Sequence, residues 1–169
     1  MTRARVPSSA LFAGIGAAAL AAVAAALVSQ HVFDMQPCPW CVLQRVVFCA
    51  LAVVAFALAG VRSAKLELLR GVGVAGLAAA GAAAALWQHF VAKSSSSCNL
   101  TLADRIVSGL GLDGLLPDVF APRASCADAA VDLLGVPYEM WSLAAFVLLG
   151  AAAAWATWQG RRRADASGG

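Results

Sequence analysis

The chain has 169 residues, of which 62% are hydrophobic and 12% are charged, and its formal net charge is +3. The charged fraction is about half that of an ordinary soluble domain, and a soluble core of this size could not bury so much apolar surface. The composition excludes a soluble globular fold and predicts a membrane protein, whose apolar side chains face lipid.

Four apolar stretches are long enough to cross a bilayer, which takes about 20 residues. Backbone groups in the hydrocarbon must pair within their own segment, so each stretch is predicted to be a helix. The predicted fold is all-α: a four-helix membrane bundle, with short helices in a long outer loop, formed as a single domain over residues 1–169. The expected spans are residues 10–30, 41–61, 71–92 and 140–159, and the expected outer loops are residues 31–40 and 93–139.

The first apolar stretch follows Arg3 and Arg5, which is the arrangement of a cleaved secretory leader. Its apolar part is longer than the roughly 7–15 residues typical of such leaders. We therefore expect this segment to be retained as the first span.

Lysine and arginine residues indicate the orientation, because they gather in cytoplasmic loops. One side of the predicted bundle carries most of them: Arg3, Arg5, Arg62, Lys65, Arg70, Arg161, Arg162 and Arg163. The other side has Arg45, Lys93, Arg105 and Arg123. Both termini are therefore predicted to be cytoplasmic. In a chain this apolar, the three consecutive arginines indicate topology rather than a nucleic-acid partner.

The five cysteines occupy three kinds of place. Cys38 and Cys41 lie at the outer mouth of the second span, and Cys98 and Cys126 lie in the long outer loop. Cys49 lies two turns inside the membrane, where a free cysteine behaves as a small hydrophobic residue. The four outer cysteines allow three pairings, of which we favour Cys38 with Cys41 and Cys98 with Cys126. Disulfides persist on the non-cytoplasmic side.

The spacing of Cys38 and Cys41 indicates redox chemistry. A C-x-x-C bridge closes too small a loop to stabilise a fold strongly, whereas the spacing is typical of reactive thiols. Pro37 and Pro39 place the helix start near Cys41, and Arg45 follows one turn deeper on the same face. We interpret Arg45 as a cation for a thiolate or for an oxyanion on an electron acceptor; the alternative is an interfacial anchor. For Cys98 and Cys126 alone, a structural disulfide is the more common interpretation.

The long outer loop contains helix signals. Thr101 with Asp104 matches a capping box, and Gly111 ends that helix. A second apolar stripe follows, which Pro117 shortens or breaks: Leu112, Leu115, Leu116, Val119 and Phe120.

Two further features bear on the loop cysteines. Ser125 with Asp128 matches a second capping box, which predicts a helix that ends at Gly135 and carries Cys126 in its first turn. A helix start favours a thiolate, which is a good leaving group. The serines of residues 94–97 predict a flexible neighbourhood for Cys98, so we expect Cys98 to be attacked and Cys126 to leave.

These motifs together resemble the disulfide bond formation protein B (DsbB) family. The resemblance extends over nearly the whole chain in order: Gln30-His31-Val32, Pro37-Cys38-Pro39-Trp40-Cys41, Gln44-Arg45, the Cys98 and Cys126 pair, Leu134-Gly135 and Trp141. The family forms an electron path in the bacterial inner membrane from a soluble periplasmic oxidase, DsbA, to a quinone.

The resemblance implies a role for each site residue. A reduced DsbA-like partner attacks the Cys98–Cys126 bridge at Cys98, and electrons pass to Cys38 and Cys41, through a transient Cys38–Cys126 bridge. Cys41 then reduces a quinone (ubiquinone or menaquinone) from the membrane pool beside Arg45. His89, at the outer end of the third span, matches a histidine of the family's quinone site. Some relatives have glutamate at the position of Gln44.

Two other functions remain open from the sequence. One is a membrane redox enzyme related to vitamin K epoxide reductase, although that family places its C-x-x-C near the end of its bundle. The other is a non-enzymatic membrane scaffold with disulfides in its loop. A metal site formed by the four outer cysteines is a more distant alternative.

Overall fold

The computed structural model describes residues 7–57, 64–92 and 101–167, with no side-chain description of Ala64 or of residues 163–167. Four long helices dominate it: α1 (Ser8–Val32), α2 (Pro39–Ala57), α3 (Ala64–Phe90) and α7 (Tyr138–Ser167). Each of them is long and apolar enough to cross a membrane. The predicted all-α fold with four membrane helices is confirmed.

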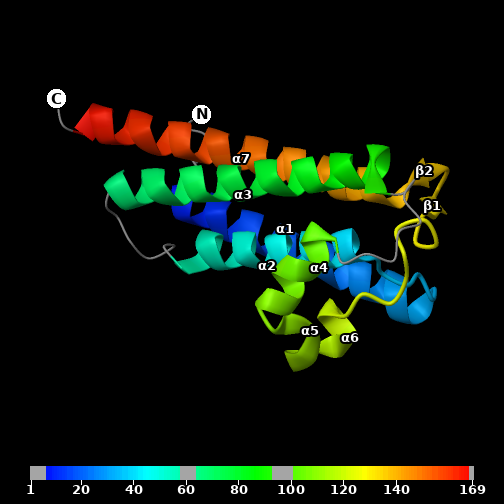
Figure 1. Cartoon of the computed structure of the whole chain (residues 1–169). Helices are drawn as coiled ribbons and strands as arrows, with labels where there is room; N and C mark the ends of the chain where they lie inside the picture. Colours follow the sequence, from blue (N-terminus) through cyan, green and yellow to red (C-terminus); the bar gives the residue numbers. More distant parts are fainter. Residues whose placement is uncertain (1–6, 58–63, 93–100, 168–169) are drawn as a thin grey trace.

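The four helices run alternately up and down, although the connection between α3 and α7 is long and contains the short helices. The start of α1 and the end of α7 lie at one end of the bundle, and the α1–α2 connection lies at the other end (Figure 1). That second end also holds a small antiparallel hairpin, made of β1 (Asp132–Leu133) and β2 (Val136–Pro137). The cysteines at the start of α2 are therefore at the hairpin end, far from the start of α1 and the end of α7.

The core of the bundle depends on close contact between α3 and α7, which pack extensively against each other. Phe48 of α2 stacks on Phe146 of α7, with ring centroids 3.9 Å apart. Phe146 is fully buried, and it lies where a side chain on Gly81 of α3 would be. Glycine at position 81 therefore makes room for the ring, as small residues commonly do between membrane helices.

Three short helices of the long loop lie along the flank of α2 (Figure 1). They are α4 (Leu102–Gly109), α5 (Leu112–Leu115) and α6 (Pro117–Phe120). Val107 and Phe120 are buried against Val42 of α2. The expected capping box of Thr101 and Asp104 is present, and the expected break is present too, since Pro117 begins α6.

The helix predicted to begin at Ser125 is wrong. The capping contacts form, because Asp128 N–H donates to Ser125 Oγ at 3.2 Å and the hydroxyl donates to Asp128 Oδ2 at 2.6 Å. Only turns follow, however, before the chain enters the hairpin. Leu134 and Gly135 both have positive φ, 57° and 76°, which is the geometry of a two-residue hairpin turn. The hairpin includes residues that the predicted helix required, so that helix does not form.

The basic residues near the start of α3 lie within the helix. Lys65 and Arg70 belong to α3, which begins before the expected third span. Arg70 is buried, and its guanidinium lies 4.1 Å from the centre of the Phe12 ring of α1. Other residues used for the orientation lie outside the described part of the chain: Arg3, Arg5, Arg62 and Lys93.

Candidate redox site

The start of α2 is built around the sulfur of Cys38. Pro37 and Pro39 prevent helix from extending upstream, so Cys38 is the last residue before α2. Its carbonyl accepts the first helical hydrogen bond, from Val42 N–H at 3.0 Å. Its Sγ accepts Cys41 N–H at 3.3 Å and lies 2.7 Å from Cys41 Sγ. The thiol therefore occupies the position of a helix N-cap.

Cys126 is held beside Cys38 by the loop that precedes it. Arg123 N–H and Ala124 N–H both donate to the carbonyl of Pro37, at 2.9 and 3.3 Å. Cys38 and Cys126 are both buried in one apolar cluster, which also contains Trp40. The structure thus joins two cysteines that are 88 positions apart in the sequence to form a line of three sulfurs, Cys126, Cys38 and Cys41. All three are free thiols.

Hydrogen bonds shift the pKa values of Cys126 and Cys38 in opposite directions. The pKa of Cys126 is lowered, chiefly because the Cys38 thiol donates to its sulfur and also because Trp40 N–H does. The pKa of Cys38 is raised, chiefly because its proton is shared with Cys126 and Cys41 and further because the thiol is buried. The first turn of α2 therefore stabilises a Cys126 thiolate. The sequence had assigned this effect to a helix beginning at Ser125.

On the other side of Cys41 lies a cavity of about 290 Å³ between the four long helices. Its walls are largely apolar and include Ala22, Ala25, Ala26, Phe48, Trp141 and Ala145. Its polar lining consists of Ser29, Cys41, Gln44, Arg45, Gln88, Tyr138, Glu139 and Ser142. Apolar walls with a few hydrogen-bond donors suit a ring that carries carbonyl oxygens, so these residues fit a quinone head group.

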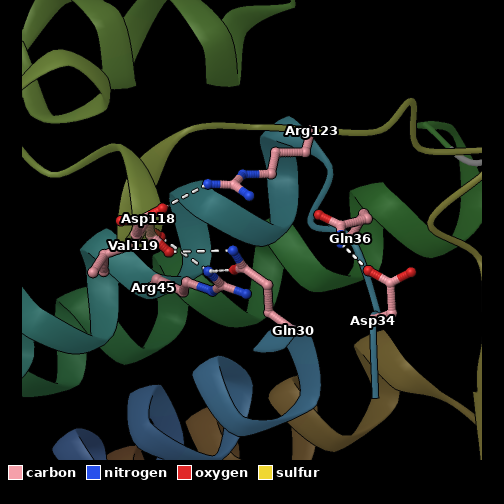
Figure 2. A network of polar contacts seen from close by, with 7 residues as sticks. All are labelled: Gln30, Asp34, Gln36, Arg45, Asp118, Val119 and Arg123. Carbon is pink, nitrogen blue, oxygen red and sulfur yellow. Dashed lines mark hydrogen bonds and ion pairs between the residues drawn. The ribbon is translucent and has the colours of Figure 1, made fainter. Parts of the chain in front are cut away.

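Arg45 is buried at the edge of this cavity and is bound by neutral acceptors. Its Nη1 donates to Gln30 Oε1 at 2.6 Å and to Val119 O at 2.9 Å, and its Nη2 donates to Ala26 O at 3.4 Å. Gln30 also donates to the carbonyl of Asp118, at 3.2 Å. Figure 2 shows the contacts of Arg45 with Gln30 and Val119, in which the guanidinium lies between the end of α1 and the backbone of α6.

The same view shows two polar contacts outside the cavity (Figure 2). Arg123 forms an ion pair with Asp118 at 2.8 Å, and Gln36 donates to Asp34. Arg123 belongs to the segment that holds Cys126 against Pro37, so the ion pair connects this segment to α6.

Two glutamines complete the surroundings of Cys41. Gln88 Nε2 of α3 donates to Cys41 Sγ at 3.2 Å, and Gln44 Nε2 of α2 donates to Gln88 Oε1 at 2.7 Å. Gln44 is 3% exposed and Gln88 is 4% exposed. A buried amide is costly unless its polar atoms are paired, and here each glutamine contributes to a chain that ends on the sulfur.

His89, the neighbour of Gln88, lies beside the cavity. Its Nδ1 is 2.7 Å from Glu139 Oε1, and its ring contacts Phe90 edge-on. Glu139 is 4% exposed and lines the cavity, whereas His89 does not belong to the lining. His89 is therefore connected to the cavity through Glu139.

Comparison with known proteins gives the family. A family model described as "Disulfide bond formation protein DsbB" matches residues 8–156. The chain belongs to the DsbB family. It is thus a membrane oxidoreductase of the disulfide-forming class, and the sequence resemblance is confirmed.

Curated relatives agree with the family model. "Disulfide bond formation protein B 1" of Pseudomonas syringae pv. syringae is 37% identical over 141 residues, which cover 79% of this chain and 80% of the relative. The protein of the same name from Burkholderia lata is 30% identical, and the matched region covers 88% of this chain and 88% of the relative. "Disulfide bond formation protein B" of Ralstonia nicotianae is 34% identical, and the matched region covers 84% of this chain and 89% of the relative. No solved structure matches the chain significantly.

The structure of this DsbB-family chain brings together most of the residues singled out from the sequence. Cys38, Cys41 and Cys126 lie in one line, and Arg45 lines the cavity that Cys41 faces. Cys49 of α2 is partly buried and packs against the cluster that contains Val107 and Phe120 of the loop helices. Cys98 and the serines of residues 94–97 lie outside the described residues.

Sequence reasoning missed the contacts of three buried polar residues. Gln88 and Glu139 were not singled out, and Gln44 was noted as part of the family motif and as a difference from some relatives, without a contact. A signal was present, since a polar side chain inside a membrane helix is rare and commonly functional. The partner of such a residue lies on another helix, and the sequence does not name it.

Proposed function

We propose that this chain is a thiol:quinone oxidoreductase that reoxidises a soluble, DsbA-like dithiol oxidase of the periplasm. Electrons enter at Cys98 and Cys126, pass to Cys38 and Cys41, and leave to a quinone in the cavity beside Arg45. The proposal places the chain in the bacterial inner membrane, with both termini cytoplasmic and the cysteine loops periplasmic.

One observation carries the proposal: Cys41 Sγ lies between a second thiol and a cavity. On one side, Cys41 is 2.7 Å from Cys38, which contacts Cys126. On the other side it faces an apolar cavity that also contains a buried cation. Thiol–disulfide exchange needs sulfurs that can attack one another in turn, and this line of sulfurs supports a relay from the outer loop to the cavity.

The described residues support the partner-facing pair as well. Cys126 lines a second hollow of about 800 Å³, between α2, α3 and α4. Ala92 and Thr101, which flank the segment carrying Cys98, line the same hollow. This arrangement supports pairing Cys98 with Cys126. The lowered pKa of Cys126 makes its thiolate a good leaving group when a partner attacks Cys98.

The cavity residues have separate tasks toward a quinone. When bound, a quinone accepts the two electrons and two protons that a dithiol releases on oxidation. Arg45 keeps its positive charge and can stabilise negative charge in the cavity. Its described acceptors are all neutral. His89 contributes through Glu139, which faces the cavity.

The test is a reaction of the purified full-length protein with a quinone. With a reduced dithiol protein as donor, we expect the absorbance of the oxidised quinone to fall and the donor to become oxidised. A Cys98→Ser variant should lose this reaction yet still reduce quinone when dithiothreitol is the donor, because small thiols reach Cys38 and Cys41 without a protein partner.

Two results would contradict the proposal. The first is a wild-type protein that forms no disulfide in its donor at the expense of quinone. The second is a Cys98→Ser variant that still accepts electrons from the protein donor at the wild-type rate. A Cys38–Cys41 pair that resists mild reductants would instead support a structural role for this bridge.

A further inference from the structure

The sulfur of Cys41 has a hydrogen-bond donor that neither the family motif nor the proposed function assigns. Gln88 Nε2 lies 3.2 Å from Cys41 Sγ. Gln88 Oε1 in turn accepts Gln44 Nε2 at 2.7 Å. The contact therefore continues from the sulfur across α3 and back to α2, and both glutamines line the cavity with Cys41.

The two hydrogen bonds together determine which end of the Gln88 amide faces the Cys41 sulfur. A glutamine amide presents a donor on one side and an acceptor on the other. Because Gln44 donates to the oxygen of Gln88, the NH₂ group of Gln88 is the end that faces Cys41. A thiolate can only accept hydrogen bonds, and in a poorly hydrated site an N–H donor to a charged acceptor is stronger than in water.

Arg45 does not take this place in the described structure. Its hydrogen bonds go to Gln30, Val119 and Ala26, so it acts on the cavity through its charge. The other titratable groups around Cys41 are Cys38 just before α2, Cys126 beyond Cys38, and Tyr138 and Glu139 of α7. Gln88 is the described side chain whose N–H reaches the sulfur.

We propose that Gln88 is a catalytic residue that stabilises the Cys41 thiolate, and that Gln44 is a positioning residue that fixes which end of the Gln88 amide faces the sulfur. The proposal rests on the proposed function, in which Cys41 is the sulfur that passes electrons on. When the Cys38–Cys41 bond forms, the two thiols lose two electrons and two protons, which the quinone takes up. Gln88 favours the thiolate from which the electrons leave.

The test measures the reactivity of Cys41 in full-length protein, reduced and free of quinone and partner. Iodoacetamide alkylation is followed across pH, with mass spectrometry that distinguishes Cys41 from Cys38. Gln88→Leu removes the donor, so we expect Cys41 to be alkylated about tenfold more slowly near neutral pH. The pH of half-maximal rate should rise by about one unit, and the limiting rate at high pH should be unchanged.

A second variant tests the positioning role. Gln44→Leu removes the donor to Gln88 Oε1 without adding a charge, so the Gln88 amide is free to turn and present its oxygen to the sulfur. We expect the pH of half-maximal rate to rise, as in Gln88→Leu, although Gln88 itself is intact. Gln159→Leu serves as the matched control, because Gln159 lies near the far end of α7; it should leave the Cys41 profile unchanged.

The results separate this inference from the proposed function. If Gln88→Leu and Gln44→Leu fold but keep the wild-type pH profile, the inference is overturned even where the wild-type protein reduces quinone. If the alkylation rate falls by the same factor at every pH, the variants change the access of the reagent to Cys41, and the inference is overturned too. If the profiles shift as expected but the wild-type protein reduces no quinone, the proposed function fails while the assignment of Gln88 to the Cys41 thiolate stands.

Discussion

At the scale of single residues, Arg45 has two tasks that one substitution can separate. It is a buried cation beside the cavity, and it also holds the backbone of α6 through Val119 O. Removing the charge should weaken quinone binding, whereas removing the hydrogen bonds should loosen the loop helices. The two effects appear in different measurements.

We predict that Arg45→Met raises the KM for quinone about ten- to a hundredfold, as expected for the loss of one charge-assisted contact. The variant should also unfold at a lower temperature, because Gln30 and Val119 lose their donor. Gln30→Leu breaks the same network but retains the cation, so its Tm should fall with a smaller change in KM. An Arg45→Met protein with wild-type quinone kinetics would make Arg45 an anchor only.

The thiols of Cys38 and Cys126 have opposite pKa shifts, which can be measured without a partner. The pKa of Cys126 is lowered mainly by the Cys38 thiol, so its thiolate should persist below the ordinary thiol pKa of 9.0. In reduced protein, Cys126 alkylation should therefore reach half its maximal rate at a lower pH than Cys38 alkylation.

A change at Cys38 tests the cause of this shift. Cys38→Ala removes the donor, so the Cys126 alkylation profile should move toward higher pH. Cys38→Ser keeps a donor and should move it less. If both variants keep the wild-type Cys126 profile, Cys38 does not stabilise the Cys126 thiolate.

At the scale of elements, the contact of α3 with α7 sets the rotation of α3 and therefore the direction of Gln88. A side chain at Gly81 would occupy the place of the Phe146 ring, while one at Gly76 would meet nothing within 4 Å. We predict that Gly81→Ala destabilises the protein by about 1–3 kcal/mol, the usual cost of overpacking.

The matched variant Gly76→Ala should be neutral or slightly stabilising, since alanine is the better helix former. Thermal unfolding followed by circular dichroism in detergent would compare the two. Equal Tm values would show that α3 and α7 can separate without cost at this point.

At the scale of the whole molecule, the hairpin lies at the opposite end of the bundle from the start of α1 and the end of α7. The proposed orientation predicts that the hairpin is periplasmic. Leu134 at the turn is 86% exposed, so Leu134→Cys in a cysteine-free background should react with a membrane-impermeant thiol reagent in intact spheroplasts. Lys65→Cys, at the other end, should react only after the membrane is opened. The reverse result would overturn the orientation and the redox proposal with it.

Much of the architecture followed from the sequence alone. Apolar segments must form helices in lipid, because their backbone groups have no water to bind, so four helices and the C-x-x-C at the mouth of the second were predictable. The capping box of Thr101 and the break at Pro117 were predictable for a similar reason, since both depend on residues close together in the chain.

The tertiary structure decided the contacts of the site. Ser125 and Asp128 form their local contact, yet a hairpin at Leu134 and Gly135 prevents the helix. Cys126 reaches Cys38 because two backbone N–H groups bind the Pro37 carbonyl, a contact that no local pattern encodes.

The same holds inside the bundle. Gln88 and His89 are adjacent and point in directions about 100° apart on the helix, so the rotation of α3 decides which one meets Cys41. Packing between helices sets that rotation, and it turns Gln88 to the sulfur and His89 to Glu139. Apolar length and local hydrogen bonding fix the helices one at a time, whereas the site depends on how the helices fit together.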